Sequence, residues 1–131
     1  MEIIPGERIG PYKPGAPDPE RQAFWKNCTV REIQKGVVYE SDEMSFWFDT
    51  DKNHVFQILV EGNSKARFNG RIGIGSTLVD VEKHVGQWYD ELDVYLLKDF
   101  PGICFALADN EIDEEWVERE ASIEYICIFI E

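Results

Sequence analysis

Hydrophobic and polar residues alternate over short distances along this chain, and the pattern predicts short strands with few helices. The most organised stretch is residues 69–86, in which a glycine-rich extended segment leads into a short helix. Leu78, Val81 and Val85 fall at helical spacing and give that helix one apolar face. We therefore expect this helix to pack on a sheet.

Both ends of this helix carry signals of their own. Thr77 followed by Asp80 is a capping box, which places a hydroxyl and a carboxylate at the positive end of the helix. Gly86 suits the left-handed residue that ends a helix. We expect the helix to lie between these signals.

The first half of the chain predicts one helix and one hairpin. A helix is expected over residues 18–27, where an aspartate can act as the N-cap, and residues 29–35 are expected to add a short helical turn. Strands are expected at Val37–Glu40, Met44–Asp49 and Val55–Glu61. The last two flank a short polar turn and should form an antiparallel hairpin.

The second half predicts another hairpin and a closing strand. Trp88–Asp93 is expected to be an acidic loop or the start of a hairpin, and Val94–Leu97 should pair with Ile103–Ala108. Asp109–Glu120 is expected to be a long acidic connection that is partly helical. Ser122–Ile130 is apolar on both faces, which favours a central strand over an edge strand.

These elements predict an α+β fold in a single domain, residues 1–131. We expect an antiparallel sheet of about five to six strands with two short helices on one face. The tripeptide Arg-Ile-Gly occurs at residues 8–10 and again at 71–73, and a helix and extended segments are expected after each copy. The repeated tripeptide and the shared order of elements favour two helix-plus-hairpin repeats, at about residues 6–61 and 69–130.

The net charge is −13, and the acidic residues concentrate in the second half. Residues 1–65 hold 11 acids and 8 bases, whereas residues 66–131 hold 15 acids and 5 bases. Such a field repels nucleic acid and anionic membranes and attracts basic partners. We therefore expect neither nucleic acid nor a membrane as a partner; the alternative, that the charge only confers solubility, stays open.

The sequence contains no recognisable signal peptide or membrane-spanning segment. No apolar run approaches the ~20 residues needed to cross a membrane, and residues 1–15 lack the basic start and apolar core of a signal peptide. We therefore expect a cytoplasmic protein. Cys28, Cys104 and Cys127 form no Cys-x-x-Cys motif, so we expect three free thiols.

The sequence assembles no recognisable active site. His54 and His84 are interpreted as solvated surface residues, and no nucleophile motif is present. Residues 70–75 lack the glycine and lysine spacing of a phosphate loop, and residues 109–115 lack the glycine of an EF-hand. We therefore predict a protein that is not an enzyme, with no catalytic residue, no cofactor and no metal.

The acidic connection before the last strand is the candidate partner-binding site. Between Asp109 and Glu120, seven acids and one arginine surround Trp116. A tryptophan among carboxylates is what a hot spot for a basic partner requires; the alternative, that Trp116 only caps the sheet, is left open. The residues predicted to bind a partner are Trp116, Glu111, Asp113, Glu114, Glu115, Glu118, Asp90, Glu91 and Asp93.

Residues 69–107 carry a resemblance to known families. With Arg-Ile-Gly-Ile-Gly-Ser-Thr-Leu-x-Asp-Val-Glu-Lys and the later Gly-Ile-Cys-Phe, the chain resembles immunity proteins of bacterial polymorphic toxins, including contact-dependent inhibition systems. The Ile-Gly-x-Gly-Ser opening is also similar to the two-repeat folds of β-lactamase inhibitors and outer-membrane-assembly lipoproteins. Those families are exported, and the missing export signal counts against their functions here.

The resemblance to immunity proteins implies stoichiometric binding of a cognate toxin domain, often a basic nuclease. We therefore expect a cytoplasmic protein that neutralises such a domain by blockade. The alternative is a protein–protein interaction or regulatory module that has no toxin partner. The sequence alone leaves the oligomeric state open.

Overall fold

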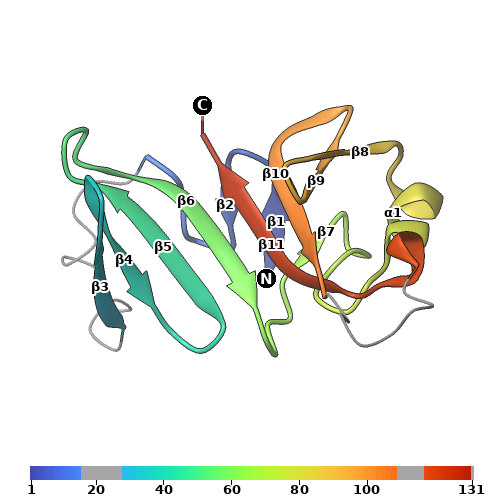
Figure 1. The fold of residues 1–131 in the computed structure, drawn as a ribbon, viewed down its shortest axis with the longest axis horizontal. Helices are drawn as coiled ribbons and strands as arrows, with labels where there is room; N and C mark the ends of the chain where they lie inside the picture. Colours follow the sequence, from blue (N-terminus) through green and yellow to red (C-terminus); the bar gives the residue numbers. More distant parts are fainter. Residues whose placement is uncertain (16–27, 109–116, 131) are drawn as a thin grey trace.

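The computed structural model describes residues 1–15, 28–108 and 117–130. In these parts of the chain, a large antiparallel sheet of eight strands packs one face against a small three-stranded sheet and one α-helix. Figure 1 shows the small sheet behind the large one. We call the face of the large sheet that meets the small sheet and the helix its inner face, and the opposite face its outer face.

The large sheet is built from two four-stranded meanders that meet at its centre. In order across the sheet, its strands are β3 (Thr29–Ile33), β4 (Gly36–Glu40), β5 (Met44–Asp49), β6 (His54–Glu61), β11 (Ile123–Phe129), β10 (Phe100–Leu107), β9 (Val94–Leu97) and β8 (Trp88–Glu91). All neighbouring pairs in this sheet are antiparallel. The closing strand β11 is central, as its two apolar faces predict.

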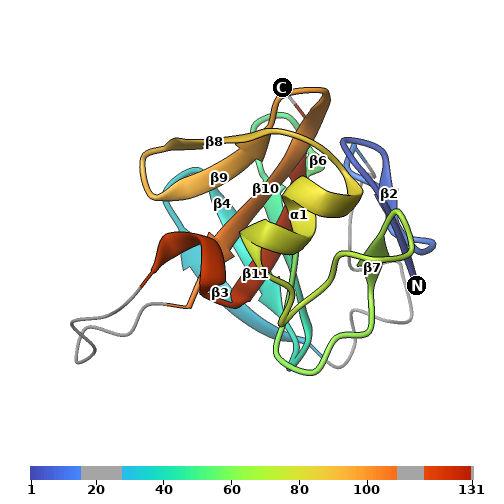
Figure 2. The ribbon, with the colours of Figure 1, turned by 90° about the vertical axis from the view of Figure 1, so that its right-hand side faces the viewer.

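The small sheet and the helix cover the inner face. The order in the small sheet is β2 (Arg8–Ile9), β1 (Glu2–Ile4) and β7 (Arg67–Phe68), with β1 antiparallel to β2 and parallel to β7. The helix α1 (Leu78–His84) and the 3₁₀ turn η3 (Glu118–Glu120) lie together near one end of the large sheet. Figure 2 shows α1 in front, with β2 and β7 on one side and the β8–β9 hairpin extending to the other.

The apolar core lies between the two sheets. Ile58 on β6 lies opposite Phe46 on one neighbouring strand and Ile128 on the other, and all three side chains are buried. Ile3 and Ile9 reach the same core from the small sheet. Because side chains on a strand alternate between faces, one set of residues on each central strand fills this core.

A close approach of two glycines joins the small sheet to the large one. The Gly6 N–H, in the turn between β1 and β2, donates to the Gly102 carbonyl oxygen on β10 at 3.0 Å. Gly102 has a φ of +88°, and a Cβ there would lie 2.6 Å from the Gly6 Cα. Glycine is therefore required at Gly102 both by its backbone conformation and by the lack of space.

The α+β fold with two helices on a sheet of five to six strands was a wrong prediction. The described chain is mostly strand, with eight strands in the large sheet and α1 as its α-helix. Residues 29–35, predicted as a helical turn, instead begin with β3, because their β-branched residues pair with β4 and extend the sheet. The helix predicted over residues 18–27 lies outside the described residues.

The capping box at the start of α1 is confirmed. The Asp80 N–H donates to the Thr77 hydroxyl at 3.2 Å, and the Thr77 N–H donates to the Asp80 carboxylate at 2.9 Å. Leu78 and Val81 on the predicted apolar face are buried, and Val85 packs against the core. The capping box and the spacing of the apolar residues therefore predicted α1 correctly.

The two meanders have mirrored positions in the sheet. The first runs inward from β3 to β6, and the second runs inward from β8 to β11. Duplication of one unit stays a prediction, which superposition of residues 6–61 on 69–130 would test.

Candidate binding site

The β8–β9 hairpin ends in an unusual turn. Its two turn residues, Leu92 and Asp93, have φ values of +48° and +69°, the backbone of a type I′ turn, which matches the twist of the strands. Asparagine or glycine normally occupies the first of these positions. Leu92 is 93% exposed, so neither the backbone nor packing against the described residues explains a leucine there.

Several predicted acids surround one buried tyrosine. The Tyr95 hydroxyl on β9 donates to the Glu118 carboxylate on η3 at 2.8 Å. Burial, together with the charges of Glu118, Asp90 and Asp93, raises the pKa of Tyr95 to about 12. Three acids from two segments, the β8–β9 hairpin and η3, therefore lie around this side chain.

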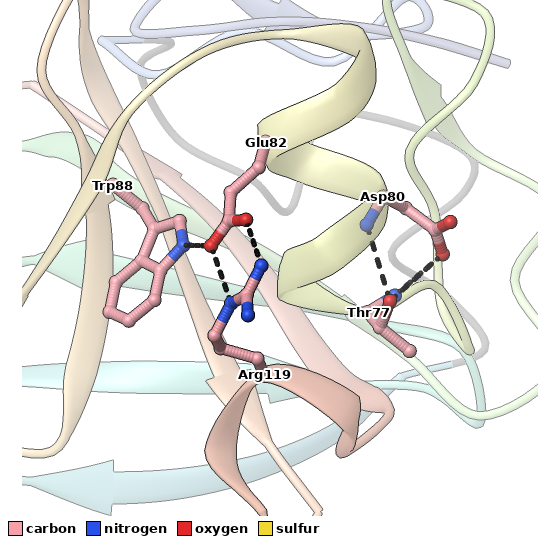
Figure 3. A network of polar contacts seen from close by, with 5 residues as sticks. All are labelled: Thr77, Asp80, Glu82, Trp88 and Arg119. Carbon is pink, nitrogen blue, oxygen red and sulfur yellow. Dashed lines mark hydrogen bonds and ion pairs between the residues drawn. The ribbon is translucent and has the colours of Figure 1, made fainter.

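A second polar network holds the helix, the hairpin and η3 together (Figure 3). The Glu82 carboxylate on α1 accepts hydrogen bonds from the Trp88 indole N–H at 2.8 Å and from the Arg119 guanidinium. The hydrogen bonds from Arg119, and then that from Trp88, lower the pKa of Glu82. Because these groups are exposed, the network positions the elements more than it stabilises the fold.

The predicted partner-binding residues divide into three groups. Asp90 lies opposite Tyr95 in the ladder and so shares its side of the sheet, where Glu118 also lies, and the charge of Asp93 in the turn acts on the same tyrosine. Glu91 lies opposite Val94 and points to the outer face. Five of the predicted residues lie outside the described parts of the chain: Glu111, Asp113, Glu114, Glu115 and Trp116.

The outer face of the large sheet carries an apolar groove of about 430 Å³ that the sequence did not reveal. It runs from the central strand β6 across β11, β10 and β9 to the β8–β9 turn. Among the described helices and strands, none lies over this face (Figure 1). The residues that line it are Gln57, Leu59, Glu91, Leu92, Val94, Leu96, Cys104, Ala106, Tyr125, Cys127 and Phe129. We call it the outer groove.

One row of residues across the floor of the outer groove is entirely uncharged. Cys104 on β10 lies opposite Cys127 on one side and Leu96 on the other, and Cys127 in turn lies opposite Leu59. The cysteines are free thiols, as is Cys28. Hydrogen bonding between the two facing thiols lowers the pKa of Cys104 and raises that of Cys127.

The neighbouring row has carboxylates near both of its ends. Glu61 on β6 lies opposite Tyr125, and Tyr125 lies opposite Ala106. On the other side, Glu91 on β8 lies opposite Val94. Among the described residues that line the outer groove, none is a lysine or an arginine.

The apolar outer face of β11 is the sequence feature that corresponds to part of the outer groove. Alternate residues of β11 are apolar on both faces, a pattern that predicts a central strand buried on both sides. Ile126 and Ile128 are buried in the core. On the other face Cys127 is also buried, but Tyr125 and Phe129 on either side of it remain partly exposed. An apolar second face on a central strand can therefore indicate an uncovered surface as well as a second layer.

Neither of the two histidines lines the outer groove. His54 lies at the start of β6 and His84 at the end of α1. Within the described ranges, no three histidine, cysteine or acidic side chains are grouped so that they could hold a metal ion. In the same ranges, no helix is long and apolar enough to span a bilayer.

Comparisons with known proteins found no match to this chain. No protein-family model matches the chain, and neither a curated protein nor a solved structure matches it. The functional argument therefore depends on the residues and geometry of the chain itself.

Proposed function

We propose that this chain is an immunity protein that binds a cognate toxin domain and neutralises it by stoichiometric blockade. The toxin domain would be basic, as many nucleases are, and the complex would form in the cytoplasm. The resemblance of residues 69–107 to immunity proteins of polymorphic toxins supports this function, and so does the net charge of −13.

The observation that carries the proposal is the gathering of acids at one end of the large sheet. Asp90, Asp93 and Glu118 surround Tyr95, and Glu91 lies on the other side of the same hairpin. Complementary charge speeds association with a basic partner and disfavours acidic ones. The apolar outer groove lies on the opposite face of this end of the sheet, where Glu91 lines it, and offers the desolvated contact that affinity requires.

A titration of toxin activity tests the proposal. The proposed function predicts a toxin gene beside this one; its toxin domain is purified, and the activity of that domain is measured with increasing amounts of the chain. We expect activity to fall linearly and to vanish near one equivalent, because blockade is stoichiometric. An unrelated acidic protein of similar net charge serves as the control, since charge alone can produce weak inhibition.

Toxin activity that persists with the chain in excess would overturn the proposal. Binding of the chain to the toxin domain without loss of its activity would support the alternative, an interaction or regulatory module that does not neutralise a toxin.

A further inference from the structure

The most exposed large apolar side chain near the outer groove is also the least explained by the fold. Leu92 lies at the tip of the hairpin with a left-handed backbone, where leucine is disfavoured, and it is 93% exposed. Residues that break a local rule without a structural benefit are often functional. Leu92 also lines the outer groove.

The floor of the outer groove continues this apolar surface over several strands. Leu59, Leu96 and Cys104 lie in one uncharged row, and each of them is only partly buried. A continuous apolar surface of this kind is typical of an interaction site. At about 430 Å³, the outer groove has room for a few apolar side chains of a partner.

The charge around the outer groove defines the chemistry of that partner. Glu91 and Glu61 lie near opposite ends of one row, with uncharged residues between them. Burial and the charges of Glu40 and Glu124 raise the pKa of Glu61, so a cation beside this carboxylate would be favourable. Among the described residues, no cation forms an ion pair with either carboxylate, so acidic partners would be disfavoured at both ends.

We infer that the outer groove binds an apolar segment of the toxin domain that is flanked by lysine or arginine side chains, an inference that rests on the proposed function. The apolar residues of the segment would lie on the row that contains Leu59, Cys104 and Leu96 and would cover Leu92. Its flanking cations would meet Glu61 and Glu91.

The first test compares two variants that each replace an exposed apolar residue. Leu92→Asn should leave folding intact, because asparagine suits the turn better than leucine, and it should weaken binding of the toxin domain by about tenfold or more. Val30→Thr, on the opposite edge strand β3, replaces a residue that is 56% exposed and should leave the affinity unchanged. The dissociation constants are measured by calorimetry.

The second test uses the thiols of the chain as reporters. Cys104 lies on the floor of the outer groove, whereas Cys28 lies outside it. The alkylation rate of each is followed by mass spectrometry. Adding the toxin domain should slow alkylation of Cys104 and leave that of Cys28 unchanged.

A set of synthetic peptides separates this inference from the proposed function. A short peptide of alternating leucine and lysine should also protect Cys104, whereas peptides of leucine and glutamate or of serine and lysine should not.

If the toxin domain binds but Leu92→Asn binds it equally well and Cys104 stays reactive in the complex, the inference fails and the proposed function stands. If the toxin domain does not bind, the proposed function fails, and protection by the leucine–lysine peptide alone then supports the chemistry of the outer groove. Equal protection by the leucine–glutamate peptide overturns the role of charge.

Discussion

At the scale of single residues, Tyr95 shows how the fold brings acids of the β8–β9 hairpin and of η3 together around one side chain. Its hydroxyl donates to Glu118, and Asp90 and Asp93 lie close enough to affect its ionisation. The neutral tyrosine suits this environment, whereas a tyrosinate would face burial and three carboxylates. The sequence predicted these acids as binding residues, but it could not show their shared neighbour, because η3 and the hairpin are brought together only by the sheet.

The raised pKa of Tyr95 predicts a specific dependence of stability on pH. The pKa is about 12 in the folded chain and about 10 in the unfolded chain. The folded state therefore holds one more proton between these values, and its stability should fall as the pH rises through this window. Below pH 10, Tyr95→Phe should lower the free energy of unfolding by about 1 kcal/mol through loss of the hydrogen bond.

Urea denaturation at pH 8 and pH 11 checks this prediction. The difference in unfolding free energy between the parent and Tyr95→Phe should shrink at the higher pH. Glu118→Gln, which keeps an acceptor but removes a charge, should lower the pKa of Tyr95 in a titration of tyrosinate absorbance. A difference between the parent and Tyr95→Phe that stays constant from pH 8 to pH 11 would contradict the account.

At the scale of elements, local signals succeeded where a short-range interaction decides the structure. The capping box of Thr77 and Asp80 placed α1 correctly, and the aromatic strands β5 and β6 lie where their patterns predict. The edge strand β3 was missed although three of its five residues are β-branched, because an edge strand forms only by pairing with a neighbour, here β4. Residues 88–93 were expected to be a loop or the start of a hairpin, but the tight turn at Leu92 was not located, because leucine is not a turn signal.

The contact between the two sheets gives a prediction at this scale. Gly102→Ala should lower the free energy of unfolding by about 3 kcal/mol or more, because the new Cβ would be strained and would collide with the Gly6 backbone. Gly70→Ala is the matched control: its φ is +69°, but a Cβ there would meet no atom within 4 Å. We expect Gly70→Ala to cost about 1 kcal/mol.

Denaturation in urea measures both glycine variants. Similar losses for the two would show that the approach of β10 to the β1–β2 turn adds nothing beyond backbone strain. The predicted difference would show that this approach helps to hold the small sheet on the large one.

At the scale of the whole molecule, charge and topology act together. Two meanders meet at β6 and β11, so the outer groove lies across the centre of the sheet and the acidic hairpin lies at its edge. The excess of acids is visible in the sequence, and the sequence also predicted that the closing strand is central. It did not predict the outer groove, because the groove depends on which strands become neighbours across the long connection between β6 and β11.

The association rate with the toxin domain, measured by stopped flow at several salt concentrations, tests the central claim most directly. Replacing an acid by lysine raises the net charge by two units. Asp90→Lys with Glu91→Lys therefore changes the net charge from −13 to −9. The control variant, Glu32→Lys with Asp51→Lys, changes it by the same amount. The first pair lies on the hairpin, whereas the control residues are exposed on β3 and in the β5–β6 turn. We predict that the hairpin pair slows association about tenfold at low salt and the control pair much less, with the difference closing as salt screens the charges. Equal rates for the two pairs at every salt concentration would contradict the claim that this end of the sheet receives a basic partner.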